Sequence, residues 1–111
     1  MIPNKELQEL AQALKRSSEY TEMIQLRRQV MGHPRFGRQM MMFEREHTRI
    51  FSQGLQQADA EQRLKKLYAD YRTLLAEAEV KKFMESTQAY QKMIGECISY
   101  LNKSLEINRA Y

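Results

Sequence analysis

Four arginines between residues 35 and 49 are the side chains best placed for chemistry in this sequence: Arg35, Arg38, Arg45 and Arg49. On a helix, which turns by about 100° per residue, these spacings place all four in one narrow sector. A guanidinium can donate two parallel hydrogen bonds to one carboxylate or phosphate, so the row could bind an acidic protein or the phosphates of RNA. The alternative is a solvated face whose arginines pair with nearby glutamates such as Glu46.

Three consecutive methionines lie within the same segment. Met40 belongs to the apolar side of the predicted helix, whereas Met41 and Met42 extend around the arginine row on both sides. Flexible thioethers are favoured at protein–protein contacts, although a methionine is also tolerated at a solvated surface. The candidate partner-binding residues are therefore Arg35, Arg38, Arg45, Arg49, Met41 and Met42.

The remaining reactive side chains favour a structural interpretation. Cys97 follows Met93 by one helical turn on an apolar stripe, which predicts a buried thiol that packs as a small hydrophobic group. One thiolate cannot complete a zinc or iron–sulfur site alone, so a functional Cys97 would have to share its ligand with another chain. Glu44 and His47 have a spacing found in carboxylate-bridged metal sites, but no second copy of that motif accompanies them.

Motifs of enzymes are absent from the sequence. It contains no glycine-rich phosphate loop, no nucleophile elbow, no HExxH and no CxxC. We therefore predict a protein that is not an enzyme and has no cofactor and no metal site.

The elements that position these residues are predicted to be helices throughout. Helical periodicity covers a first helix capped by Asn4, a second capped by Ser18, and a third from Pro34 to about Gln53. Gly32 is expected in the left-handed position between the second and third helices, and Pro34 in the first turn of the third. The apolar face of the third helix comprises Phe36, Met40, Phe43, His47, Ile50 and Phe51.

The second half of the chain continues this pattern after a loop at residues 54–59. Asp59 and Gln62 form a capping-box signature for a fourth helix whose apolar stripe runs to Ala78. Ser86 and Thr87 could cap a last helix that reaches Leu105, and residues 80–105 could equally form one bent helix. The predicted fold class is an all-α small bundle of about five to six helices, two or three of them long and amphipathic, completed by dimerisation.

Length and charge limit the classes of protein that remain. A chain of 111 residues has room for one domain, so we expect a single helical domain over residues 1–111. Its 42% hydrophobic residues and mean hydropathy of −0.71 suit long, thin helices with much solvated surface, or a core completed by a second copy of the chain. The net charge of +4 lies below that of dedicated nucleic-acid binders.

The sequence also indicates in which cellular compartment the protein is expected. One cysteine fits a reducing compartment, and no signal-peptide core or membrane-length apolar run is present. We therefore expect a cytoplasmic protein that does not insert into membranes.

Several strings carry a resemblance to a known family. They are residues 17–23 (SSEYTEM), residues 38–44 (RQMMMFE) and, most closely, residues 83–96 (FMESTQAYQKMIGE) with Ile98, Leu101 and Asn102. Together with the order of the helices, they resemble the YlbF/YmcA-like family of small bacterial regulatory proteins over about residues 5–106.

This resemblance implies an all-α fold that dimerises and a non-enzymatic adaptor role. Members of the family act in regulatory complexes linked to competence, biofilm formation and sporulation, and to RNA processing through a membrane-anchored ribonuclease. Some members carry several cysteines and bind iron–sulfur clusters with partner chains; that feature is not transferred here, because only Cys97 is present. The expected partners are a second copy of the chain and other regulatory proteins. An RNA-associated role for the arginine row is the alternative.

Overall fold

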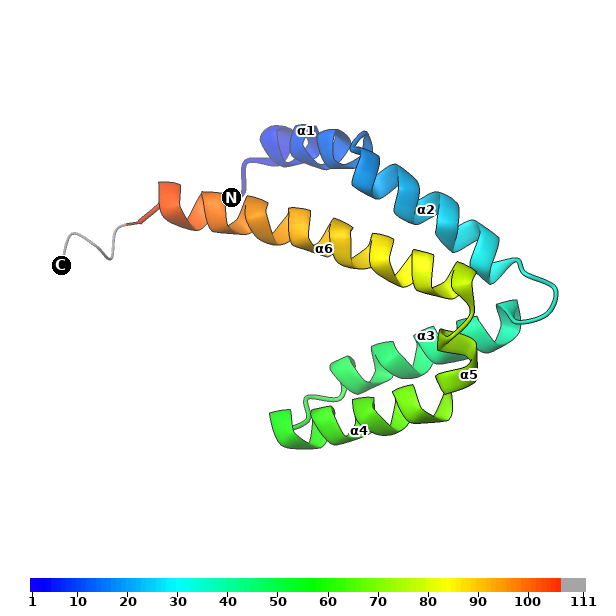
Figure 1. Cartoon of the computed structure of the whole chain (residues 1–111). Coiled ribbons are helices and arrows are strands. Elements are labelled where there is room, and N and C mark those ends of the chain that lie inside the picture. Colours follow the sequence, from blue (N-terminus) through cyan, green and yellow to red (C-terminus); the bar gives the residue numbers. More distant parts are fainter. Residues whose placement is uncertain (107–111) are drawn as a thin grey trace. The chain divides into compact units, whose positions relative to one another are not determined.

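The computed structural model describes residues 1–106, which form six helices and contain no strand (Figure 1). The predicted all-α fold is confirmed. The helices are α1 (Asn4–Lys15), α2 (Ser18–Met31), α3 (Gly37–Ser52), α4 (Gln57–Asp70), α5 (Arg72–Leu75) and α6 (Ala78–Ser104).

The chain divides into two compact units. The central unit is Leu26–Phe83; the terminal unit joins Met1–Gln25 to the described residues from Met84 to Glu106. Both α2 and α6 contribute residues to each unit. The single domain expected over residues 1–111 stays a prediction.

The hydrophobic core lies in the central unit. Every buried hydrophobic side chain of the described residues falls between positions 30 and 83. These side chains come from the end of α2, the following turn, α3, α4, α5 and the start of α6, so burial of apolar surface holds these elements together. They are Val30, Phe36, Met40, Phe43, Ile50, Leu67, Leu74, Val80 and Phe83.

Helices α3 and α4 form a hairpin that presents most of the candidate residues (Figure 1). Gly54 has a φ of 64°, the left-handed conformation that glycine adopts without strain, and it ends the α3 segment as expected. Across the hairpin, the ring of Phe43 packs against Tyr68 and Tyr71 at centroid distances of 5.7 and 5.5 Å. Phe51, predicted on the buried face, is 63% exposed, because it lies in the last turn before the loop.

The prediction that α3 starts at Pro34 is wrong, and so is the left-handed position for Gly32. Gly32 continues the helical hydrogen bonding by donating its N–H to the carbonyl of Arg28, and Gly54 is the described residue with positive φ. Residues 34–36 form a turn, in which His33 Nδ1 accepts the Arg35 N–H at 3.1 Å and the His33 carbonyl accepts the Gly37 N–H at 2.9 Å. These local bonds replace the first helical turn.

Several predicted helix boundaries also need correction. The cap of α2 is Ser17, whose hydroxyl accepts the Tyr20 N–H at 3.1 Å, one residue before the predicted Ser18. Helix α4 begins at Gln57, so Asp59 lies inside its first turn and does not cap it. Asn4 and Ser86 likewise lie within helices and not at their caps.

The second half of the chain also differs in where its helices end. The helix predicted to reach Ala78 ends at Asp70 and is followed by the short α5. Residues 78–104 form one helix, which settles the alternative left open above.

Candidate protein-binding surface

The arginine row is divided by ion pairs within the chain. Arg35 precedes α3 and donates two hydrogen bonds to Glu77, at 2.6 and 3.1 Å, one to each carboxylate oxygen. This bidentate pair lowers the pKa of Glu77 below its ordinary value. On α3, Arg49 pairs with Glu46 one turn earlier at 3.3 Å. Two of the four predicted arginines therefore already have a carboxylate partner.

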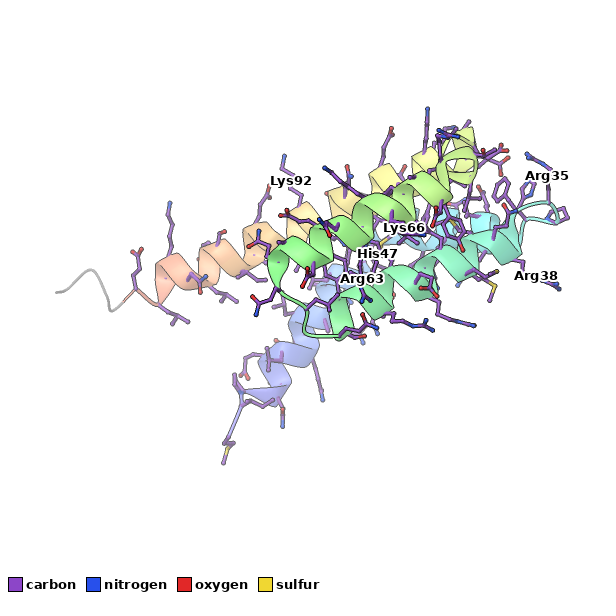
Figure 2. All side chains as sticks on the ribbon, turned by 90° about the horizontal axis from the view of Figure 1, so that it is seen from below. Arg35, Arg38, His47, Arg63, Lys66 and Lys92 are labelled. Carbon is purple, nitrogen blue, oxygen red and sulfur yellow. The ribbon has the colours of Figure 1, made fainter. Side chains whose placement is uncertain are left out.

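Arg38 and Arg45 are the other two members of the row. Both side chains are exposed, and within residues 1–106 neither of them forms an ion pair or a hydrogen bond. Figure 2 shows Arg38 pointing outward from α3. Met41 and Met42 lie between them in the sequence and are 52% and 51% exposed. We call Arg38, Met41, Met42 and Arg45 the arginine–methionine surface.

An ion pair borders this surface on the side of α2. Arg27 donates a hydrogen bond to Glu44, which raises the pKa of Arg27 above its ordinary value. Both residues line an open hollow of about 300 Å³ together with Met41, Arg45 and Thr48. Glu44 is therefore already engaged by an arginine. Across residues 1–106 no group of three or more His, Cys, Asp or Glu side chains could hold a metal ion.

His47 belongs to an aromatic cluster on the other side of α3. Its ring lies 4.9 Å from that of Phe51 and 6.4 Å from that of Tyr68, measured between centroids. The side chain is half-buried, and the loss of hydration lowers the pKa of His47, against the smaller opposing effect of Glu44. The cluster gives His47 a packing role.

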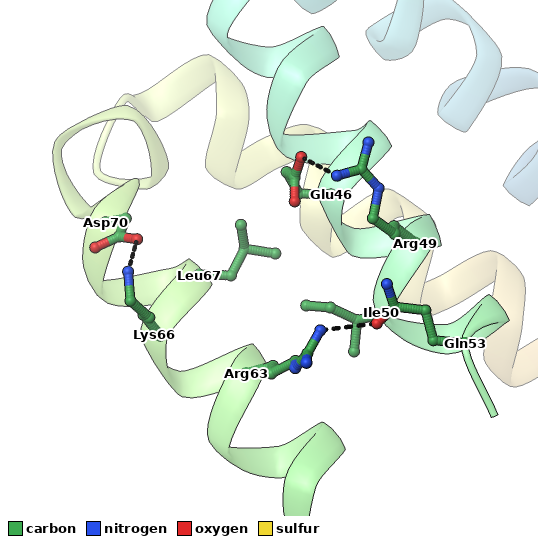
Figure 3. Close-up of a pocket in the computed structure, with 8 residues that line it drawn as sticks. All are labelled: Glu46, Arg49, Ile50, Gln53, Arg63, Lys66, Leu67 and Asp70. Carbon is green, nitrogen blue, oxygen red and sulfur yellow. Dashed lines mark hydrogen bonds and ion pairs between the residues drawn. The ribbon is translucent and has the colours of Figure 1, made fainter. Parts of the chain in front are cut away.

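A groove between α3 and α4 is a feature that the sequence analysis missed. It has a volume of about 280 Å³ and combines charged side chains with two apolar ones (Figure 3). From α3 it is lined by Glu46, Arg49 and Ile50, from the residue after α3 by Gln53, and from α4 by Arg63, Lys66, Leu67 and Asp70. Of these, only Arg49 was predicted as a binding residue.

The terminal unit carries a second, apolar groove that includes Cys97. The prediction that Cys97 is buried is wrong: its side chain is half-exposed, because the groove beside it is open. The groove has a volume of about 400 Å³ and is lined by Leu10, Met93, Glu96, Cys97, Tyr100 and Leu101. In contrast to the central unit, the described part of the terminal unit buries no hydrophobic side chain.

Comparison with known proteins agrees with the helical pattern. A model of the family described as "Control of competence regulator ComK, YlbF/YmcA" matches residues 4–106. The chain belongs to this family. No curated protein and no solved structure matches the chain.

Membership in the YlbF/YmcA family confirms the resemblance drawn from the sequence strings. The family is a regulatory one, concerned with control of the competence regulator ComK. Within residues 1–106, no helix of this YlbF/YmcA protein is long and apolar enough to cross a membrane.

The residues that sequence reasoning missed share a physical reason. Glu77 lies 42 positions from Arg35, and Arg63 lies 10 positions from Gln53, across the loop of the hairpin. A spacing on one helix cannot reveal such partners. The available signal on α4 was the spacing of Arg63, Lys66 and Asp70 by three and four residues, which places them along one helical face.

Proposed function

We propose that this chain is a non-enzymatic adaptor that homodimerises and binds an acidic regulatory protein through the arginine–methionine surface. The observation that carries this proposal is a pair of exposed arginines, Arg38 and Arg45, that have no ion-pair partner among residues 1–106 and lie on one helix with two exposed methionines between them. Family membership supports a regulatory role, and we extend it to the processes of competence, biofilm formation and sporulation. A cytoplasmic location remains part of the proposal, as does the lack of catalysis.

The surface has the chemistry of a protein contact. Arg38 and Arg45 are two helical turns apart, a rise of about 10.5 Å along α3. Carboxylates seven residues apart on a partner helix have the same spacing. Met41 and Met42 offer adaptable apolar area beside the charges, and methionine and arginine are both enriched at protein interfaces. An acidic partner helix is therefore the best match.

RNA is the less favoured partner. Two of the four predicted guanidiniums already pair with a carboxylate among the described residues, which halves the number of phosphate contacts that the row could make. Binding to RNA would weaken steeply as salt rises, because phosphate contacts release counterions.

The terminal unit supports the homodimer. Large apolar side chains on α1, in the last turns of α6 and directly after it remain exposed, while no hydrophobic side chain among the described residues of this unit is buried. Leaving so much apolar area in water is unfavourable, and a second copy of the chain would cover it. The exposed side chains are Leu7, Leu10, Ile98, Tyr100, Leu101 and Leu105.

The dimer is tested by light scattering on the whole chain. We expect twice the monomer mass of 13.2 kDa at micromolar concentration. Ile98→Glu with Leu101→Glu should give the monomer mass with unchanged helicity, because both side chains are already about half exposed, at 52% and 47%. A control, Lys103→Glu, should remain dimeric. A wild-type mass of 13.2 kDa would refute the dimer.

The partner surface is tested by charge reversal. Arg38→Glu with Arg45→Glu should abolish capture of the acidic partner from the native cell and leave helicity and dimer mass unchanged. Losing a desolvated charge pair costs about 2–5 kcal/mol of binding free energy, much of it from the group left unpaired on the partner. Arg16→Glu with Arg72→Glu makes the same change in net charge on exposed side chains elsewhere and should retain capture. Equal capture by both double variants would refute the proposal.

A further inference from the structure

The groove between α3 and α4 has an unequal distribution of charge. Two of its three cations are matched by acids of their own helix: Arg49 by Glu46 at 3.3 Å and Lys66 by Asp70 at 3.1 Å. The third cation, Arg63, has no carboxylate partner among residues 1–106. One unmatched positive charge therefore remains in the groove.

Arg63 is held in place across the hairpin by a neutral group. One of its terminal nitrogens donates a hydrogen bond of 2.8 Å to the side-chain oxygen of Gln53, which directly follows α3 (Figure 3). A guanidinium carries five N–H donors, so most of them remain available. The bond to Gln53 fixes the direction of the side chain and reduces the entropy lost when an anion binds.

The apolar lining of the groove is as informative as its charges. Ile50 from α3 and Leu67 from α4 lie between the charged side chains, and each is 7% exposed (Figure 3). The exposed edges of these two side chains give the groove a small apolar patch, which suits a ligand that carries an apolar group beside its negative charge. A glutamate or aspartate next to an aliphatic residue in a peptide has both.

We propose that this groove binds an acidic segment of a partner protein, with one carboxylate on Arg63 and an aliphatic side chain over Ile50 and Leu67. The ligand class is a peptide carboxylate and not a phosphate. Glu46 and Asp70, which also line the groove, would repel a doubly charged phosphate more than a singly charged carboxylate. Ile50 and Leu67 offer a phosphate no hydrogen bonds.

The inference deepens the proposed function and rests on it for the identity of the partner as a protein. Arg49 follows Arg45 by one turn of α3 and also lines the groove, so the two surfaces are continuous. The segment that binds the arginine–methionine surface can therefore continue into the groove. The groove adds a second contact, which would supply specificity for an acidic residue beside an aliphatic one.

The test uses the whole ¹⁵N-labelled chain and the tetrapeptide acetyl-Glu-Leu-Glu-Leu-amide as the probe. Titration should shift the side-chain Nε–H resonance of Arg63 and the amides of Gln53 and Leu67. The neutral peptide acetyl-Gln-Leu-Gln-Leu-amide should not shift them. Arg63→Gln should weaken binding by about tenfold or more, the usual loss for a hydrogen bond to a charged group. Arg63→Lys keeps the charge but lacks the paired N–H donors of the guanidinium, so its affinity for the tetrapeptide should lie between those of wild type and Arg63→Gln.

Matched controls separate this inference from the proposed function. Arg72→Gln removes an exposed arginine outside the groove and should bind the tetrapeptide as wild type does. Arg38→Gln with Arg45→Gln should also retain tetrapeptide binding within about twofold. These two arginines are exposed, so water and salt screen their electrostatic effect on a ligand bound at Arg63. Loss of the groove hypothesis would appear in tetrapeptide binding, whereas loss of the proposed function would appear in partner capture, so the two results can be distinguished.

Three outcomes would overturn the inference. Inorganic phosphate that binds at Arg63 more tightly than the tetrapeptide would identify an anion site without peptide selectivity. Unchanged tetrapeptide affinity in Arg63→Gln, or shifts confined to residues outside the groove, would show that the groove is not the binding site. Circular dichroism of each variant verifies that the helices are retained.

Discussion

Gly37 is the position at which a single methyl group should disturb the candidate surface most. It is buried at the first position of α3, where the chain returns against the end of α2. A Cβ added at Gly37 would overlap the carbonyl oxygen of Met31 and lie 3.0 Å from its carbonyl carbon. Both atoms belong to the backbone, so they cannot move aside as a flexible side chain would.

The size of the effect follows from this geometry. Carbon atoms pack at about 3.5–4.0 Å, so the new methyl group is too close by at least about 0.5 Å. Inserting a methyl group into a well-packed site costs about 1–3 kcal/mol. The φ of Gly37 is not positive, so alanine can adopt this backbone conformation. Because alanine lowers the conformational entropy of the unfolded chain, it offsets about 0.4–1 kcal/mol of this cost. From the midpoints of these two ranges, we expect Gly37→Ala to lower the free energy of unfolding by about 1.3 kcal/mol.

Thermal unfolding followed by circular dichroism measures this loss, and Gly95→Ala is the matched control. A Cβ at Gly95 meets no atom within 4 Å, and the residue lies inside α6. Gly95→Ala should therefore stabilise the chain by about 0.5–1 kcal/mol, the helix preference of alanine over glycine. All three proteins must be compared at one concentration, because the stability of a dimer depends on it.

Gly37→Ala and Gly95→Ala should change the free energy of unfolding in opposite directions. A destabilisation of 1 kcal/mol lowers Tm by about 4–8 °C in a chain near this size. If Gly37→Ala melts at or above the wild-type temperature, the close approach of α3 to Met31 is wrong. The turn at residues 33–36 would then have a different conformation, and Arg35 would lie elsewhere.

Two further predictions concern the two units. Cys97 lines the apolar groove of the terminal unit, so its reaction with a maleimide should slow as protein concentration rises and the dimer forms; a rate independent of concentration would place Cys97 outside the interface. Arg35 lowers the pKa of Glu77, so this pair stabilises the fold above the ordinary glutamate pKa, and that stability is lost as the pH falls through the lowered value. Glu77→Gln should therefore destabilise the chain at pH 7 and approach wild-type stability in acid, and a difference that persists at low pH would contradict the assignment.

The sequence predicts the long helices well because each carries a stripe of apolar residues at helical spacing. Phe43 and Ile50, placed on the apolar face of α3 by periodicity, are buried as expected. Local signals at the ends are weaker. Asp59 has the spacing of a capping box, yet Gln56 adopts an extended ψ of 148° and α4 starts at the next residue. Helix ends depend on backbone geometry that a short motif does not fix.

The candidate site was predictable only where it lies on one helix. Arg38, Met41, Met42 and Arg45 share α3, so their common face follows from their spacing. The ion pair of Arg35 was missed because its partner, Glu77, lies far away in the sequence. The groove around Arg63 requires α3 and α4 to be in register, which no pattern on either helix specifies.

Site-specific photo-crosslinking in the native cell tests the central claim most directly. A benzophenone amino acid in place of Met42, which is 51% exposed beside the arginines, should crosslink to one partner protein through a segment rich in Asp and Glu. The same probe at the exposed position of Lys82 on α6 should not capture that partner, and Arg38→Glu with Arg45→Glu should abolish the crosslink at position 42. Crosslinks from position 42 that go only to a second copy of this chain, or that survive the charge reversal, would contradict the account.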